Sequence, residues 1–222
     1  GPPRIAQEPG GGVDIAWGRN ETWAIRSANG ATFPAPAVKI SSVAQDSGGP
    51  RVAVDSTGKV YVAWTDEVNK LATGSYCGQT NTGSTAAFTN TTGGNFYFNA
   101  TASGAAFAVG NTRNLSRTDW AGVSARWQPG YFGCSYDNLI LLIDSRDDLH
   151  MIWANDLPDQ EVLASAYPLA GSTGTPRVSF PTILSATSAA SPHAVVANGS
   201  SGSPTVHVVW SDGPADQTAQ AA

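Results

Sequence analysis

The chain has 222 residues, a formal net charge of −5 at pH 7, and only 13% charged residues. Its 24 glycines and 14 prolines, with few of the strong helix formers Lys and Glu, argue against a mostly helical fold or a coiled coil. The acidic balance argues against nucleic acid as a partner, because phosphate binding needs a concentrated basic surface. No apolar run approaches the ~18 residues that a membrane-spanning helix needs, so we expect no membrane span.

A strand–turn–strand pattern occurs four times along the chain. Each copy has an apolar run, a polar turn with Gly, Asp or Asn, and an alternating apolar strand that ends in tryptophan. The period of two and the β-branched residues predict β-hairpins. We expect the four tryptophans to be core residues that fill space between sheets. The copies span residues 3–17, 50–66, 138–156 and 192–212, with the tryptophans Trp17, Trp64, Trp153 and Trp210.

More strands follow the tryptophans. A third strand is predicted at 22–27, 70–76 and 161–167, and a fourth at 37–41. Trp17 and Trp64 lie 47 residues apart, a length that fits one four-stranded blade of a β-propeller. We therefore predict an all-β propeller of four-stranded antiparallel blades, with four or five blades visible, which is either incomplete or part of a larger chain. This domain covers 1–212, with regular blades at about 1–49, 50–90, 136–185 and 186–212.

Residues 91–135 interrupt the repeat. Trp64 and Trp153 lie 89 residues apart, close to two repeat lengths. One interpretation is a degenerate blade with strands at 95–99 and 105–109, and the other is a long loop inserted between blades. The last blade stops after its second strand, so we expect its open edge to accept a strand from a partner or from further polypeptide. Residues 213–222 are expected to be a disordered tail.

Two short segments carry a family resemblance. Residues 51–64 read RVAVDSTGKVYVAW, and residues 27–33 read SANGATF, with Asn29 where the related turn has Asp. Together they resemble the sialidase-like propellers, whose blades carry Asp-box (BNR) turns of the pattern S-x-D-x-G-x-T-W/F. In an active sialidase the resemblance implies three arginines on a carboxylate, a Tyr–Glu nucleophile pair and an Asp acid/base. No such residue maps onto a motif here, and Arg4 and Arg51 share a repeat position typical of scaffold residues.

The aromatic segment 120–132 is the strongest candidate for ligand binding. Its rings and an interleaved arginine could stack on sugars or contact a partner, and the alternative is that they cover the core of the degenerate blade. The candidate ligand-binding residues are Trp120, Arg126, Trp127 and Tyr131.

Other chemistry-bearing residues are assigned to the scaffold. Asp144, Asp147 and Asp148 could attract Ca²⁺, but the repeat places them in a solvated hairpin turn. His150 and His207 match Tyr61 in the repeat, which favours a packing role. We predict no metal and no cofactor.

The cysteines and glycosylation sequons favour an extracytoplasmic location. Cys77 and Cys134 either form a disulfide or are two buried thiols. Five Asn-X-Ser/Thr sequons are candidates for N-glycosylation, at Asn20, Asn90, Asn99, Asn114 and Asn198. We therefore expect a secreted or cell-surface protein.

Two functions stay open at this point. The first is an extracellular, non-catalytic recognition or scaffold module that binds a glycan or a protein. The second is a sialidase-like glycoside hydrolase, which would require arginines and at least two carboxyl or phenol groups to converge at the central axis. The missing catalytic set favours the first function.

Overall fold

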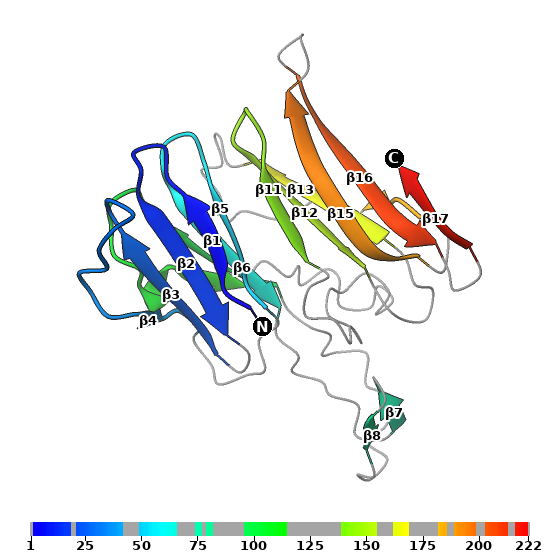
Figure 1. Cartoon of the computed structure of the whole chain (residues 1–222), viewed down its shortest axis with the longest axis horizontal. Helices are drawn as coiled ribbons and strands as arrows, with labels where there is room; N and C mark the ends of the chain where they lie inside the picture. The colour runs from blue at the N-terminus through cyan, green and yellow to red at the C-terminus, as the bar shows by residue number, and fades with distance from the viewer. Residues whose placement is uncertain are drawn as a thin grey trace.

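The computed structural model shows an all-β chain made of small antiparallel sheets (Figure 1). It describes residues 2–18, 21–41, 49–65, 74–76, 79–81, 96–114, 139–154, 162–168, 182–185, 189–198, 203–212 and 216–221. Within these residues the strands form three four-stranded sheets, one three-stranded sheet and a separate two-stranded hairpin. The described helical structure is a single 3-10 turn, η1 (Val109–Asn111), and no described helix is long and apolar enough to cross a membrane.

The first sheet follows the predicted pattern closely. Its strands lie side by side in chain order, and the third strand coincides with the predicted range 22–27. Trp17 and Trp23 face each other across the second and third strands. The strands are β1 (Arg4–Gln7), β2 (Val13–Gly18), β3 (Thr22–Ser27) and β4 (Val38–Lys39).

The third and fourth sheets repeat this meander. The third sheet contains β11 (Ile140–Ile143), β12 (Asp148–Ala154), β13 (Val162–Pro168) and β14 (Thr182–Ile183). The fourth contains β15 (Ala189–Asn198), β16 (Pro204–Asp212) and β17 (Asp216–Ala221).

The predicted disordered tail is wrong for residues 216–221, because these residues form β17 and pair with β16. The edge of β16 that we expected to accept a strand from elsewhere is therefore occupied by this chain. β17 pairs through backbone hydrogen bonds, which need no apolar side chains. Its polar sequence DQTAQA therefore forms a strand without the apolar alternation that predicts one.

The second sheet departs from the predicted blade. Its strands are β5 (Arg51–Val54), β6 (Val60–Thr65), β9 (Phe96–Thr101) and β10 (Thr112–Asn114), so it spans 51–114 rather than 50–90. The predicted third strand at 70–76 is wrong. Residues 74–76 form β7 (Gly74–Tyr76), which pairs with β8 (Gln79–Asn81) in a hairpin apart from the four sheets (Figure 1). β9 takes the place beside β6 because it sets Phe98 opposite Ala63 and Tyr97 opposite Trp64.

The interpretation of a degenerate blade is wrong for its two predicted strands, and the interpretation of a long loop between blades falls largely on residues outside the described part of the chain. The predicted strand at 95–99 lies in β9, which belongs to the second sheet, and the predicted strand at 105–109 does not form. In chain order, residues 66–95 are inserted between the second and third strands of one sheet, β6 and β9, and not between two sheets. Residues 115–138 lie outside the described part of the chain.

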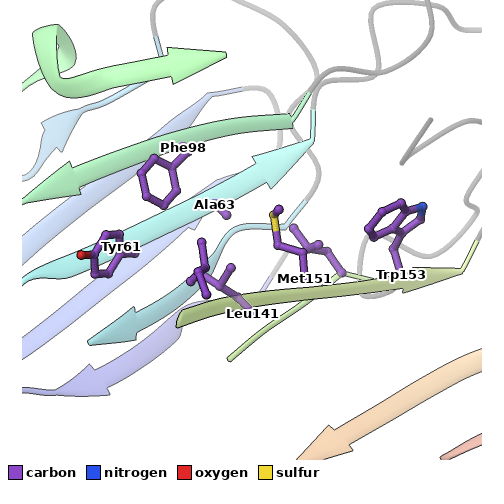
Figure 2. Packing of buried hydrophobic residues seen from close by; sticks show 8 residues of the cluster. Tyr61, Ala63, Phe98, Leu141, Met151 and Trp153 are labelled. Atoms are coloured by element: carbon purple, nitrogen blue, oxygen red, sulfur yellow. The ribbon is translucent and has the colours of Figure 1, made fainter. Parts of the chain in front are cut away.

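Successive sheets pack face to face through the second strand of each. One core cluster lies between the first and second sheets, another between the second and third, and a third between the third and fourth. β6 supplies Val60, Val62 and Trp64 to the first cluster and Tyr61 and Ala63 to the next. Figure 2 shows this second contact, in which Tyr61, Ala63 and Phe98 face β11 and β12.

Each buried tryptophan points toward the preceding sheet. Trp64, Trp153 and Trp210 are 2%, 1% and 5% exposed, and each belongs to the cluster shared with the sheet before its own. Trp17 holds the same repeat position in the first sheet, where no described sheet precedes it. It is only half-buried, in contrast to the core role we expected.

The difference in burial between Trp153 and Trp17 predicts that replacing each with alanine will lower the stability of the fold by different amounts. Trp153→Ala should lower the free energy of unfolding by about 3 to 5 kcal/mol, because it leaves a cavity between two packed sheets. Trp17→Ala should cost less than about 2 kcal/mol, because solvent already reaches that side chain. Urea unfolding of dilute protein, followed by circular dichroism, measures both. Equal losses would contradict the assignment of Trp17 to an uncovered face.

Candidate functional site

The hairpin turns of the first three sheets lie together at one end of the molecule. Each turn begins with a carboxylate, at Glu8, Asp55 and Asp144. A Cβ placed on Gly58, in the turn after β5, would lie 3.4 Å from Glu8 Oε2. Because the turns after β1, β5 and β11 are neighbours, the first strands of these three sheets run in the same direction. We call this the turn end of the sheets.

Asp55 organises the turn of the second sheet. Its Oδ1 accepts hydrogen bonds from the backbone N–H of Thr57 (2.9 Å) and Lys59 (2.9 Å), and from Thr57 Oγ1 (2.7 Å). Its Oδ2 accepts one from the Tyr61 hydroxyl at 2.8 Å. Burial acts to raise the pKa of Asp55, but these hydrogen bonds outweigh it and lower the pKa below 3.8. The carboxylate is therefore held ionised by the turn that it closes.

Asp144 repeats this arrangement in the third sheet. It accepts from the backbone N–H of Arg146 (2.8 Å) and Asp148 (3.0 Å), and its Oδ2 lies 2.9 Å from His150 Nε2. Burial again acts to raise the pKa of Asp144, and the hydrogen bonds, that of His150 foremost, lower it overall. His150 thus takes the place of Tyr61, so the repeat position identified in the sequence has a defined role as partner of the turn carboxylate.

Asp147 joins two sheets at the turn end. Its Oδ1 accepts from the Ser56 N–H at 2.9 Å, and its Oδ2 from Ser56 Oγ at 2.6 Å. The backbone of Asp147 is left-handed, with φ of 61°. The carboxylates of Asp144 and Asp147, which were considered as Ca²⁺ ligands, therefore accept hydrogen bonds within a turn and between two sheets. No cluster of three or more potential metal ligands occurs among the described residues.

A buried ion network lies between the first and second sheets. Asp14 on β2 and Arg26 on β3 are directly opposite in register, and both face the second sheet. Arg26 Nε lies 2.8 Å from Asp14 Oδ1 and 3.0 Å from Glu8 Oε1. The other oxygen of Glu8 accepts from Ser103 Oγ, in the loop after β9, at 3.0 Å. The guanidinium group of Arg26 thus contacts the carboxyl groups of both Asp14 and Glu8.

The second sheet completes the surroundings of Arg26. Its Nη1 donates to the carbonyl oxygens of Ala102 (2.7 Å) and Ala105 (2.5 Å). The guanidinium carbon lies 5.4 Å from the centre of the Phe107 ring, within range of a cation–π contact. Arg26 therefore fastens the loop between β9 and β10 onto the first sheet.

Asp14 and Glu8 form a coupled carboxyl pair. Burial raises the pKa of Asp14 to about 6, Arg26 acts to lower it, and the neighbouring Glu8 carboxylate raises it further. Asp14 Oδ2 is buried with no donor beside it among the described residues. Because its pKa is raised, Asp14 binds a proton more readily than an exposed aspartate does. Asp14 is 0% exposed, and its contacts with Arg26 lie between two packed sheets rather than in an open cleft.

Arg4 and Arg51 lie at the other end of the first strands of their sheets. They begin β1 and β5 at matching positions, Arg4 opposite Ala16 and Arg51 opposite Ala63, and both are half-buried. Arg51 Nη1 lies 3.4 Å from the carbonyl oxygen of Gly49. A four-residue strand is about 13 Å long, so these arginines do not share a site with the turn carboxylates. We call this the entry end of the sheets.

Asn29, in the segment that resembles an Asp-box turn, forms an Asx turn. Asn29 Oδ1 accepts from the backbone N–H of Ala31 (3.0 Å) and Thr32 (3.0 Å) and from Thr32 Oγ1 (3.3 Å). Gly30 has φ of +71°, a left-handed conformation that a Cβ would strain. Asn29 therefore stabilises the connection from β3 to β4 and has a structural role.

Most of the predicted site residues lie outside the described part of the chain. This holds for the two cysteines, two sequon asparagines and all four candidate ligand-binding residues: Cys77, Cys134, Asn20, Asn90, Trp120, Arg126, Trp127 and Tyr131. Asn114 and Asn198 end β10 and β15.

Asn99 is the sequon asparagine whose side chain is described. It is 0% exposed, and its Nδ2 donates to Ala108 O and to Thr112 Oγ1, both at 2.9 Å. A glycan on that nitrogen is incompatible with this packing.

Comparisons with known proteins give matches of fold alone. No protein-family model matches the chain, and no curated protein does. Among solved structures it is similar to an α-L-arabinofuranosidase from Lactobacillus brevis, with 12% identity, a TM-score of 0.50, and coverage of 99% of this chain and 65% of that one. An endo-arabinase from Bacteroides thetaiotaomicron has 13% identity, a TM-score of 0.46, and coverage of 99% and 72%. An ulvan lyase from a new polysaccharide-lyase family has 10% identity, a TM-score of 0.48, and coverage of 93% and 44%. This chain spans less than two thirds of two of these three neighbours.

The carboxyl pair predicts a distinct pH dependence of stability. Because the pKa of Asp14 is raised to about 6 in the folded chain, its deprotonation lowers stability as pH rises from about 4 through 6. Asp14→Asn mimics the protonated acid, so it should remove up to about 3 kcal/mol of this loss. Chemical unfolding of both proteins at pH 5 and pH 7.5 measures the difference. Asp14→Ala, which also leaves a cavity, should destabilise at both values, and a D14N profile that parallels the wild type would refute the raised pKa of Asp14.

The contribution of Asp144 to stability should depend on pH in the opposite direction to that of Asp14. Its lowered pKa means that its stabilisation is present above about 4 and is lost as pH falls through the folded value. Asp144→Asn should therefore cost about 1 to 3 kcal/mol at pH 7 and much less near pH 2. Arg146→Gln changes an exposed side chain of the same turn and is the matched control. Thermal melts across this range test whether the two variants separate only at the higher pH.

Proposed function

We propose that this chain is the β-propeller portion of an extracytoplasmic carbohydrate-binding protein. The observation that carries the proposal is the stacking of successive meander sheets, each covered by the next, with first strands that run in one direction. β5 contacts both β1 and β11, and β15 contacts β11. Antiparallel sheets that stack in this way around their first strands are blades about a common axis.

The entry end is the proposed sugar-binding end. Arg4 and Arg51 begin the first strands of two neighbouring sheets there and mark this end of the molecule as half-buried scaffold residues. The chain enters β11 at the same end, directly from the segment that carries Trp120, Trp127 and Tyr131. Flat aromatic rings bind the apolar faces of sugars, so we propose these residues and Arg126 as the ligand-binding set.

A carbohydrate ligand is favoured over other partners by the fold. The arabinofuranosidase of similar fold is, by its name, an enzyme of arabinose-containing substrates. The net charge of −5 disfavours nucleic acid and strongly acidic polymers. Neutral plant polysaccharides such as arabinan are therefore the first ligands to test.

Binding without hydrolysis is the preferred form of this proposal. The buried carboxyl groups of Glu8, Asp14, Asp55 and Asp144 lie at the turn end, where they hold turns and sheets together. Glycoside hydrolysis is the second candidate, supported by the fold likeness to the arabinofuranosidase. Hydrolysis would need a carboxyl pair at the entry end, in addition to those at the turn end.

Affinity electrophoresis in gels containing arabinan or other neutral polysaccharides tests the proposal. The chain should be retarded, and Trp120→Ala and Trp127→Ala should each weaken binding by about tenfold or more through loss of stacking. Phe33→Ala removes an exposed ring in the β3–β4 connection at the turn end and should leave retardation unchanged. Release of reducing sugar by the purified chain would establish the hydrolase instead. A chain retarded by none of these gels would refute carbohydrate binding.

A further inference from the structure

We propose that Asn29 is a site of spontaneous hydrolytic deamidation, at which the folded chain converts the amide to a carboxylate and gains stability. The co-reactant is water, and the products are ammonia and an aspartate at position 29. The site lies in the exposed connection between β3 and β4 and takes no part in the carbohydrate-binding surface proposed above.

The surroundings of Asn29 Oδ1 are those of a carboxylate oxygen. Besides the three hydrogen bonds from Ala31 and Thr32, this oxygen accepts one from Ser27 Oγ at 3.1 Å, so four donors converge on it. The side-chain nitrogen of Asn29, by contrast, donates to no acceptor among the described residues. Replacing that nitrogen by an oxygen therefore breaks no hydrogen bond, and donors bind an ionised acceptor about twice as strongly as a neutral one.

Gly30 supplies the nucleophile, which is its own backbone nitrogen. Gly30 is exposed, and it has no Cβ that would hinder the approach of this nitrogen to the side chain of Asn29. The Gly30 N–H donates to no acceptor in the described part of the chain. An exposed N–H outside any hydrogen-bonded ladder gives up its proton to solvent base readily, and the deprotonated nitrogen is the reactive form.

The reaction has two steps. The Gly30 nitrogen bonds to Cγ of Asn29, the Cγ–Nδ2 bond breaks, and Nδ2 leaves as ammonia with the proton that Gly30 has lost. Negative charge develops on Oδ1 during this attack, where the four donors stabilise it. Water then adds to Cγ of the cyclic imide: its hydroxyl stays on Cγ, its proton returns to the Gly30 nitrogen, and the bond between them breaks.

The fold also selects the product. Water can instead add to the backbone carbonyl carbon of the imide, which gives isoaspartate and inserts the side-chain methylene into the main chain. The main chain has little room to shift here, because a Cβ on Gly30 would lie 3.1 Å from Gly11 O and 3.4 Å from Val13 Cγ2. The four donors also polarise the Cγ carbonyl and not the backbone one. The folded chain should therefore form mainly aspartate.

Ageing of the folded chain at neutral pH, followed by peptide mapping, tests the reaction. The peptide with position 29 should gain the mass difference between an amide and a carboxyl group, with aspartate in excess, whereas chain aged in urea should give mainly isoaspartate. Thr32→Val removes the hydroxyl donor and should slow conversion in the folded chain by about twofold to tenfold. Thr32→Ser keeps a hydroxyl and should restore the rate. An unconverted Asn29, or isoaspartate as the main product of the folded chain, would overturn the proposal.

Asn29→Asp measures the gain in stability directly. The variant should melt about 2 to 4 °C above the wild type at pH 7, because the turn donors hold its carboxylate. This advantage should shrink as pH falls below about 4, where the carboxyl group takes up a proton. Gln7→Glu makes the same chemical change at an exposed residue of β1 and should give no such rise. An Asn29→Asp variant that melts at or below the wild type at pH 7 would contradict the stabilising role.

The charged side chains on the elements around this turn are already paired with one another. They are Glu8 and Asp14 with Arg26, and Lys39 with Glu21. The pH dependence of the difference between Asn29→Asp and the wild type therefore reports the new carboxyl group, since these pairs are common to both proteins.

Discussion

The structure depends on strands that are buried on both faces. The second strand of the middle sheets sends alternate side chains into two different cores, as β6 does with Trp64 on one side and Tyr61 on the other. A four-stranded sheet by itself cannot cover both of these surfaces, so each sheet depends on packing against a neighbour. Burial of the tryptophans at positions 64, 153 and 210, and the partial exposure of Trp17, follow from this single constraint.

Charged groups of the chain are used where sheets must turn or be joined. Asp55 and Asp144 close hairpin turns with hydrogen bonds from backbone amides and from Tyr61 or His150, which lower their pKa values. Asp14 is in the opposite situation, because burial raises its pKa to about 6 although the neighbouring Arg26 guanidinium acts to lower it. The charged groups at the turn end are thus used to stabilise turns and to join neighbouring sheets.

Local patterns predicted much of this fold correctly. The four hairpins, the third strands at 22–27 and 161–167 and the Asn29 turn are set by alternation and turn chemistry within a few residues. The third strand of the second sheet was missed because residues 70–76 and 96–101 both carry strand signals. The contact of Phe98 and Tyr97 with β6 selects the second of these across a long insertion. The Arg26 network was missed because Asp14 and Arg26 look like ordinary strand residues until register sets them opposite each other.

The sequence alone determined an all-β chain of tryptophan-tipped hairpins and the identity of the residues in its turns. These depend on backbone preference and on a period of two, which act over short distances. The tertiary structure decided which strands pair and which carboxyl groups share Arg26. Those outcomes depend on contacts between residues far apart in the chain. Such contacts stabilise one arrangement over another only after the sheets have stacked and buried them.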